Sequence, residues 1–237
     1  MRREEFMNNI FGIILSGGSG SRMKSDKPKQ FSYLRDMTLL EHSVKSFNEW
    51  GFFKSIVVVS NPDYILETEN SISKYLLAND RIVAGGATRH ESSLKGLEAL
   101  HYDDKDIVIF HDAARPFFLK SELHAVANAA VMYGAATVSD NVNETIVSCF
   151  EGKVENILKR DEINLIKTPQ SLHTSLLQIL LKEKLEEEPT DLCSWALQFG
   201  VKTYLIRSNP FNMKITRDGD LELADRYFDL FRQLEQN

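Results

Sequence analysis

The sequence predicts a single α/β domain with a doubly wound, mostly parallel sheet and a projecting β-arm. In the first half, short apolar runs alternate with longer segments of helical period, which is typical of a parallel sheet covered by helices. After Val138 this alternation breaks, and two strand-like segments flank a turn. A length of 237 residues and a hydrophobic content of 43% are enough for one core of this kind.

The first half contains the strands and helices of the predicted sheet. Apolar runs of strand length lie at Ile10–Leu15, Ser55–Val59, Arg81–Ala84, Ile107–Phe110 and Ala135–Val138. Between them, apolar residues three and four positions apart predict helices at Leu39–Trp50, Tyr64–Leu77, Arg89–Leu100 and Ser121–Tyr133. Right-handed crossovers would place such helices on both faces of the sheet.

The second half predicts the arm and the C-terminal elements. Two strand candidates flank Glu151-Gly152, so we expect a hairpin within an arm at about residues 141–168. Its strands are predicted at Glu144–Cys149 and Lys153–Leu158, followed by helices at Leu172–Leu185, Leu192–Phe199 and Asp220–Leu234 and a strand at Thr203–Ile206. Because no repeat or linker-like tract interrupts the chain, residues 1–237 are expected to form one domain.

Composition excludes several classes of protein. A formal net charge of -6 argues against a nucleic-acid binder, which needs a basic face to displace counterions. No run approaches the roughly 18 apolar residues of a membrane span, and the N-terminus lacks the apolar region of a signal peptide. Cys149 and Cys193 match no metal-ligand spacing, so free thiols are expected. We therefore expect a soluble cytoplasmic protein.

A glycine-rich turn follows the first predicted strand. Ser16, Gly17, Gly18, Ser19 and Gly20 allow a tight bend whose backbone N–H groups can face an anion, which favours a phosphate-bearing ligand. No Walker A lysine and no third glycine follow at the required spacing, so neither a P-loop NTPase nor a Rossmann dehydrogenase is indicated. Taken alone, the turn is equally compatible with a simple tight connection.

Two cations follow in the same loop. Arg22 and Lys29 suit a triphosphate, because phosphoryl and nucleotidyl transfer depend on fixed positive charges. The alternative is a solvated charged loop. Two further segments, 85–92 and 111–116, follow the third and fourth strands. Since the carboxyl ends of parallel strands meet at one edge, these segments predict a shared nucleotide site.

The segment 111–116 also offers charged groups for the second substrate. Asp112 can assist a magnesium ion or bind hydroxyls, and Arg115 can hold a phosphate, although an Asp–Arg ion pair would explain both residues. His111 ends a buried strand and is interpreted as structural.

These motifs together resemble the 2-C-methyl-D-erythritol 4-phosphate cytidylyltransferases and the related ribitol 5-phosphate cytidylyltransferases. The resemblance covers nearly the whole chain, and the motifs occur in family order. They are residues 17–23, Lys27-Pro-Lys-Gln-Phe31, 85–92 with Gly96-Leu97, His111-Asp-Ala-Ala-Arg-Pro116, Glu144-Thr145-Ile146, Lys167-Thr-Pro-Gln170, Thr190-Asp191 and Asn212-Met-Lys-Ile-Thr216. The resemblance implies a Rossmann-like nucleotidyltransferase fold and a homodimer whose arm crosses to the second subunit.

The resemblance also implies roles for individual residues. The catalytic cations are Arg22, Lys29 and Lys214, which contact the phosphates of CTP. The nucleotide-binding residues are Ser16, Gly17, Gly18, Ser19, Gly20, Gly86, Ser92 and Asp112. The residues for the polyol phosphate are Asp112, Arg115, Thr145, Arg160, Thr168 and Thr190, with Arg160 reaching the partner subunit's site.

The implied reaction is an in-line attack of a polyol phosphate on the α-phosphorus of CTP, with Mg²⁺ on the triphosphate and release of pyrophosphate. The metal ligands stay open, with Asp112 as a candidate. Because the attacking phosphate is already anionic, the site can work without a general base, which agrees with the absence of a Ser-His-Asp or Cys-His arrangement.

The acceptor is the least determined part of the prediction. Asp112-Ala-Ala-Arg115 favours 2-C-methyl-D-erythritol 4-phosphate, whereas Leu192-Cys193 after Thr190-Asp191 favours ribitol 5-phosphate. We expect methylerythritol phosphate and keep ribitol phosphate as the alternative. A noncatalytic nucleotide-binding protein is a third hypothesis, against which the three separated cations argue.

Overall fold

A seven-stranded sheet forms the centre of the computed structural model, which describes residues 8–18, 28–182 and 184–236. The strand order is β11-β7-β10-β6-β1-β4-β5. The strands are β1 (Ile10–Ser16), β4 (Phe53–Ser60), β5 (Arg81–Ala84), β6 (Ile107–Asp112), β7 (Ala135–Asn141), β10 (Asn164–His173) and β11 (Tyr204–Arg207). All neighbouring strands pair in parallel except β10, which is antiparallel to both β6 and β7.

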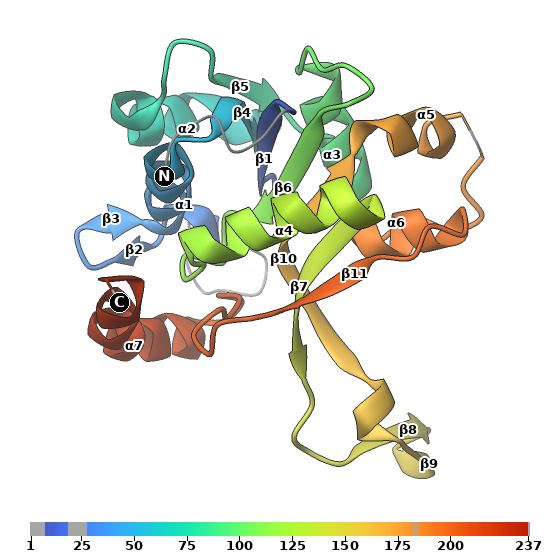
Figure 1. The fold of residues 1–237 in the computed structure, drawn as a ribbon. Coiled ribbons are helices and arrows are strands. Elements are labelled where there is room, and N and C mark those ends of the chain that lie inside the picture. Colours follow the sequence, from blue (N-terminus) through green and yellow to red (C-terminus); the bar gives the residue numbers. More distant parts are fainter. Residues whose placement is uncertain (1–7, 19–27, 183, 237) are drawn as a thin grey trace.

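Helices cover both faces of this sheet (Figure 1). One face carries α1 (Leu39–Trp50), α2 (Ile65–Ile72) and α4 (Lys120–Tyr133), and the other carries α3 (Arg89–Glu98), α5 (Leu177–Leu180) and α6 (Leu192–Gln198). Alternate side chains of β1 enter two different cores, because Ile14 packs with α1 while Ile13 packs with α3. The predicted doubly wound, mostly parallel sheet is confirmed.

Local signals explain why the helices begin and end where they do. Helix α1 starts with a capping box, in which Thr38 accepts from the Glu41 backbone N–H and the Glu41 side chain accepts from Thr38. It ends at Gly51, whose φ of 79° is the left-handed conformation that glycine adopts without strain. The predicted helix at Tyr64–Leu77 is shorter, because α2 ends at Ile72 and a 3-10 turn follows.

The predicted helix at Leu172–Leu185 is wrong. Strand β10 continues to His173, and among the described residues of that range only α5, four residues long, is α-helical. Leu172 belongs to the sheet core, where it pairs with Val108 of β6 and Ala135 of β7. The apolar residues in this range are spaced as in a helix, but they belong to two elements, the end of a strand and a short helix. Both elements bury their side chains in the same core.

A third packing unit surrounds the C-terminal helix α7 (Asp218–Gln236). It includes a small hairpin, β2 (Tyr33–Leu34) and β3 (Met37–Thr38), which the sequence did not predict. Leu34, Phe117, Ile215 and Phe231 form its core. The described residues also form the 3-10 helices η2 (Lys29–Phe31), η3 (Pro62–Tyr64), η4 (Ser73–Tyr75), η5 (Arg160–Glu162) and η6 (Thr174–Leu176).

The β-arm projects from the end of β7 and returns through β10 (Figure 1). Its hairpin consists of β8 (Ile146–Phe150) and β9 (Lys153–Leu158), joined by Glu151 and Gly152 with φ angles of 50° and 78°. Positive φ at both turn residues matches the right-handed twist of the flanking strands, and the hairpin predicted around Glu151-Gly152 is present. Among the described residues, no helix is long and apolar enough to cross a membrane.

Candidate active site

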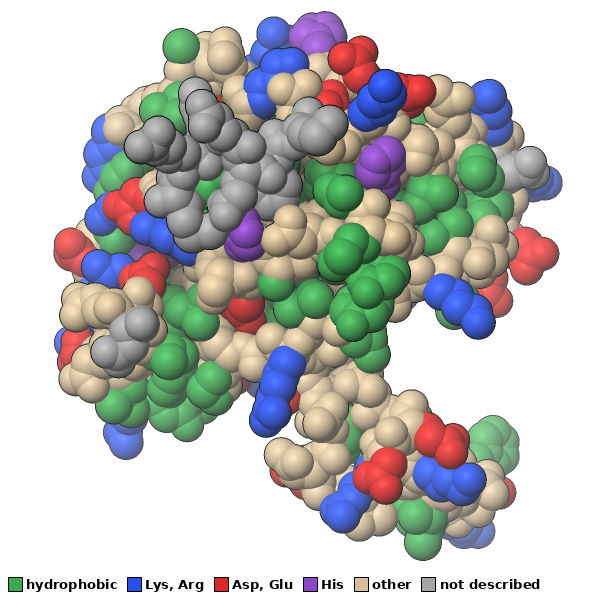
Figure 2. Space-filling view, in the orientation of Figure 1, with side chains coloured by type: hydrophobic (Ala, Val, Ile, Leu, Met, Phe, Trp, Pro, Cys, Tyr) green, Lys and Arg blue, Asp and Glu red, His purple; other side chains and the backbone are tan. Residues whose placement is uncertain are grey.

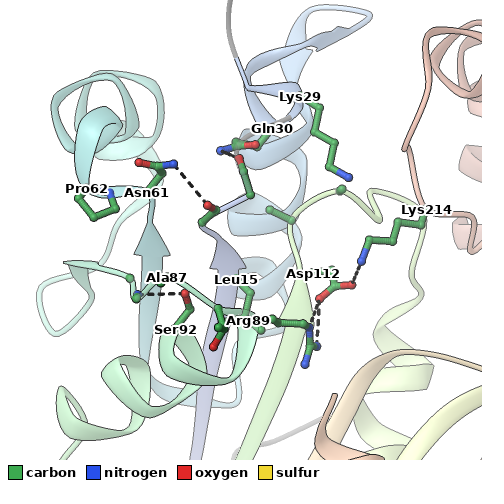
Figure 3. A pocket seen from close by; sticks show the side chains of 17 residues that line it. Leu15, Lys29, Gln30, Asn61, Pro62, Ala87, Arg89, Ser92, Asp112 and Lys214 are labelled. Atoms are coloured by element: carbon green, nitrogen blue, oxygen red, sulfur yellow. Dashed lines mark hydrogen bonds and ion pairs between the residues drawn. The ribbon is translucent and has the colours of Figure 1, made fainter. Parts of the chain in front are cut away.

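The strand ends at one edge of the sheet surround a cleft of about 670 Å³ (Figure 3). It lies where β4 and β5 are on one side of β1 and β6 is on the other, the position at which open α/β sheets bind ligands. The structure brings together these predicted residues at the cleft: Gly17, Gly18, Lys29, Gly86, Ser92, Asp112 and Lys214.

Asp112 is the charged centre of the cleft. Its Oδ1 accepts from Arg89 Nη2 at 3.0 Å and its Oδ2 from Lys214 Nζ at 2.6 Å, whereas Arg115 Nε lies 4.0 Å from Oδ2. Burial acts to raise the pKa of the Asp112 carboxyl, but the charges of Arg89 and Lys214 outweigh this and hold the pKa well below its usual range. Asp112 is therefore ionised at all ordinary pH values.

A buried hydrogen-bonded chain fixes the backbone of Asp112. The Asp112 N–H donates to Thr168 Oγ1 at 3.1 Å, and Thr168 Oγ1 lies 3.1 Å from His111 Nδ1. Because His111 Nε2 lies 3.0 Å from the Arg115 carbonyl oxygen, which can only accept, Nε2 carries the proton and Nδ1 accepts from Thr168. Burial lowers the pKa of His111 to about 3, so this histidine stays neutral.

Lys29 lines another side of the cleft, together with Gly17 and Gly18. Lys29 begins η2, and the next residue, Gln30, is buried. Gln30 Nε2 donates to the Ser16 carbonyl at 2.8 Å and to the Gly18 carbonyl at 3.2 Å, which ties η2 to the end of β1. In Figure 3 the amino groups of Lys29 and Lys214 point toward the same part of the cleft.

In the loop after β5, the backbone of two glycines lies close against the first turn of α3 at the edge of the cleft. A Cβ atom on Gly86 would lie 2.3 Å from Glu91 Cβ, and one on Gly85 would lie 2.7 Å from Ser92 Oγ, so both positions require glycine. Ser92 Oγ accepts from the Gly86 N–H at 3.2 Å. Because Ser92 lines the cleft and its hydroxyl keeps a proton, it can donate a hydrogen bond to a ligand.

Other predicted residues lie elsewhere. Ser16 is buried at the end of β1, while Arg115 and Thr168 lie behind Asp112 without lining the cleft. Thr145 and Arg160 are exposed on the arm, and Thr190 is exposed before α6. Arg22, Ser19 and Gly20 lie outside the described residues.

Sequence reasoning assigned no role to several residues that line the cleft, among them Gln30, Asn61, Pro62 and Arg89. Asn61 and Pro62 follow β4, so applying the strand-end rule to the second strand would have found them. Arg89 lies within the quoted segment 85–92, and only the fold shows that it pairs with Asp112, 23 residues away.

The described lining of the cleft contains three cations, Lys29, Arg89 and Lys214, and one carboxylate. A positively charged cleft in a chain of net charge -6 favours binding of a polyanion such as a nucleoside triphosphate. A doubly wound sheet, a glycine turn at the end of β1 and converging cations are the features of an α/β nucleotidyltransferase.

Comparisons with known proteins specify the family. The profile of the 2-C-methyl-D-erythritol 4-phosphate cytidylyltransferases matches residues 10–229. A protein of that name from Leptospira borgpetersenii is 44% identical over 95% of this chain and 96% of its own length. A ribitol-5-phosphate cytidylyltransferase from Lactiplantibacillus plantarum is 33% identical over 91% of this chain and 96% of its own. The chain belongs to the 2-C-methyl-D-erythritol 4-phosphate cytidylyltransferase family.

Solved structures agree in fold. The 4-diphosphocytidyl-2C-methyl-D-erythritol synthase of Anaerococcus prevotii superposes with a TM-score of 0.79 at 25% identity, covering 94% of this chain and 96% of that one. The 2-C-methyl-D-erythritol 4-phosphate cytidylyltransferase of Thermus thermophilus gives a TM-score of 0.73 at 26% identity, covering 93% and 98%. Both comparisons extend over nearly the full chain, so the whole fold is shared.

Proposed function

We propose that this chain transfers the cytidylyl group of CTP to 2-C-methyl-D-erythritol 4-phosphate and releases pyrophosphate. The observation that carries the proposal is the cleft, in which Arg89 and Lys214 pair with the carboxylate of Asp112 and Lys29 lines another side, together with Gly17 and Gly18. For the acceptor, the 44% identity to the Leptospira protein favours methylerythritol phosphate over ribitol phosphate, for which the quoted relative is 33% identical.

In the proposed reaction, an anionic phosphate oxygen of the acceptor forms a bond to the α-phosphorus of CTP. The bond from that phosphorus to the bridging oxygen breaks on the opposite side, and the electron pair leaves with pyrophosphate. Lys29 and Lys214 would neutralise charge on the triphosphate, a function also predicted for Arg22, while Gly86 and Ser92 would hold the cytidine. His111 is fully buried with both ring nitrogens engaged, which supports a mechanism without a histidine base.

A magnesium ion fits the donor set if the triphosphate supplies most of its ligands. Asp112 is the one carboxylate in the described lining of the cleft, and Mg²⁺ is usually held by one or two carboxylates together with substrate phosphates. When bound, the ion would supply further positive charge at the triphosphate oxygens. We assign Asp112 as the candidate protein ligand.

We also propose a homodimer held by the arm. Apolar side chains are exposed along the hairpin, with Phe150 at 67%, Val154 at 64% and Ile157 at 73% of full exposure, and Figure 2 shows apolar side chains among the charged ones on the arm. A two-stranded hairpin without its own core is marginally stable, so a second copy that covers it would stabilise it. Thr145 and Arg160 lie on this arm, and in the dimer they would serve the partner subunit's acceptor site. The cytoplasmic location stays a prediction from the sequence.

The test is pyrophosphate release from CTP with methylerythritol 4-phosphate and with ribitol 5-phosphate at the same Mg²⁺ concentration. We expect kcat/KM to be at least about tenfold higher for methylerythritol phosphate, since a pocket that pairs each acceptor hydroxyl discriminates by this much or more. A tenfold preference for ribitol phosphate would overturn the acceptor. CTP binding without release of pyrophosphate from either acceptor would favour a noncatalytic nucleotide-binding protein.

A further inference from the structure

Gln170 ends the Lys167-Thr-Pro-Gln170 motif and lies inside the fold, not in the cleft. The residue is 1% exposed and belongs to β10, two positions beyond Thr168. Its side chain reaches both the neighbouring strand β7 and the first residues of α6. A buried carboxamide in this place needs hydrogen-bond partners, and those partners indicate what the residue does.

The carboxamide is fully engaged. Nε2 donates to Asp191 Oδ2 at 3.0 Å and to Thr137 Oγ1 at 3.2 Å, and Oε1 accepts from the Leu192 N–H at 3.2 Å. A carboxylate at this position would keep the acceptor for Leu192 but lose both donors. The site therefore requires a neutral amide.

On one side, Gln170 fixes the N-terminus of α6. Asp191 is the N-cap of this helix, and its Oδ1 accepts from the Ser194 N–H at 2.8 Å. Gln170 holds the other oxygen of the same carboxylate and the first N–H of the helix. Thr190 precedes the cap, with its exposed hydroxyl 3.3 Å from Ser194 Oγ, so its position follows from that of the cap.

On the other side, Gln170 supports the irregularity in β10 that carries Thr168. The register between β10 and β7 shifts between Ile166 and Gln170. Thr137 Oγ1 donates to the Lys167 carbonyl at 2.9 Å across this shift and accepts from Gln170. Residues 167–169 thereby leave the ladder with β7, and Thr168 reaches the Asp112 N–H.

We propose that Gln170 is a positioning residue for the acceptor half of the active site, because one buried carboxamide sets the places of both Thr168 and Thr190. The inference rests on the proposed function and on the family resemblance, which implies that Thr190 and the buried Thr168 serve the polyol phosphate. The hydrogen bonds of Gln170 within the described chain involve neither the glycine turn nor Gly86 or Ser92. Gln170 reaches Asp112, which also serves the nucleotide, through Thr168. Loss of the carboxamide should therefore weaken acceptor binding far more than CTP binding.

The test is Gln170→Glu, which keeps the shape and changes only the hydrogen-bonding groups. At pH 8 a carboxylate would face Asp191 where an N–H now donates at 3.0 Å. We expect KM for the polyol phosphate to rise by about tenfold or more, and KM for CTP to change by less than about twofold. Near pH 6 the new carboxyl, whose pKa is raised by burial and by Asp191, regains a proton and a donor, so the acceptor KM should fall back toward the wild-type value.

Two further variants complete the design. Gln178→Glu makes the same chemical change on the exposed surface of α5 and should leave both KM values unchanged. Gln170→Glu combined with Asp191→Asn exchanges donor and acceptor across the same contact, and asparagine is a good N-cap. This double variant should recover the acceptor KM at pH 8, which a general loss of stability would not explain.

Parallel rises in both KM values, or an unchanged acceptor KM in folded Gln170→Glu protein, would overturn the inference. If that variant does not fold, Thr137→Val is used instead, because it removes the hydrogen bonds of the Thr137 hydroxyl with the Lys167 carbonyl and with Gln170. An unchanged acceptor KM in Thr137→Val protein would also overturn the inference. Acceptor binding to the CTP-loaded protein is measured by calorimetry alongside turnover. Wild-type protein that neither binds nor turns over the polyol phosphate would refute the proposed function and this inference together. If wild type is active but Gln170→Glu does not raise the acceptor KM more than the CTP KM, only the inference is refuted.

Discussion

Replacing Lys29 by alanine should remove most of the catalytic rate and leave the fold intact. Lys29 begins η2, whose turn is closed by backbone bonds from Phe31 N to the Pro28 carbonyl at 3.0 Å and from Ser32 N to the Lys29 carbonyl at 2.9 Å. These bonds and the anchoring of Gln30 do not need the Lys29 side chain. Because the side chain is only half-buried, we expect the free energy of unfolding to change by less than about 1 kcal/mol.

The loss of activity should be much larger. The Lys29 amino group points into the cleft toward the space that Lys214 also faces (Figure 3). A preorganised group that stabilises charge developing on a transferred phosphate is worth about 2.7–4 kcal/mol, which corresponds to a fall of about 10²- to 10³-fold in kcat. A difference of this size between activity and stability separates a catalytic role from a structural one.

The assay is steady-state pyrophosphate release from CTP with methylerythritol 4-phosphate, together with urea unfolding of each protein. Lys95→Ala is the matched control, because Lys95 is exposed on α3 and pairs with Glu98 at 3.1 Å away from the cleft. We expect the control to keep its activity. Folded Lys29→Ala protein with a rate within about threefold of wild type would refute the reasoning.

Three other predictions test the site and the arm. Asp112→Asn should lower the free energy of unfolding in urea by about 1–3 kcal/mol, because it leaves the two contacting cations without their counter-charge, and an unchanged value would contradict the ion-pair account. Burial lowers the pKa of His111 from 6.5 to about 3, so the contribution of the neutral ring to stability is complete above pH 6.5 and is lost as the pH falls toward 3. The free energy of unfolding of wild type, measured in urea, should therefore exceed that of His111→Asn by less and less as the pH falls from 6.5 to 3. A constant difference would contradict the assignment of a buried neutral histidine. Mixing Arg160→Ala with Lys29→Ala subunits should restore part of the activity through one intact composite site, whereas verified mixed dimers without recovery would exclude a shared site.

Much of the cleft could be predicted from the sequence because it depends on one geometric rule. Apolar runs marked the strands, and polar residues directly after parallel strands meet at one edge. That rule alone placed Gly17, Gly86 and Asp112 near one another. The ion pair between Asp112 and Arg89 could not be predicted in the same way, because it depends on how α3 is oriented against the sheet.

Strand β10 was missed for a related reason. Its buried polar residues, Thr168 and Gln170, obtain their hydrogen bonds from Asp112, Thr137 and Asp191, which lie 21 to 56 positions away in the sequence. Patterns of apolar residues carry no information about such partners, and tertiary hydrogen bonding rather than local propensity decides this strand. The antiparallel strand in an otherwise parallel sheet thus remained hidden.

The arm shows a different limit of sequence reasoning. The Glu-Gly turn and the alternating flanks specify the hairpin locally, and the fold agrees with them. Nothing local, however, specifies what Arg160 contacts. Among the described residues, its guanidinium donates to the Asn143 carbonyl on its own arm at 3.1 Å and pairs loosely with Asp161 at 3.8 Å. Contacts this weak at an exposed arginine contribute little to the stability of a single subunit. In the proposed dimer, the function of Arg160 is therefore encoded in a surface complementary to a second copy of the chain.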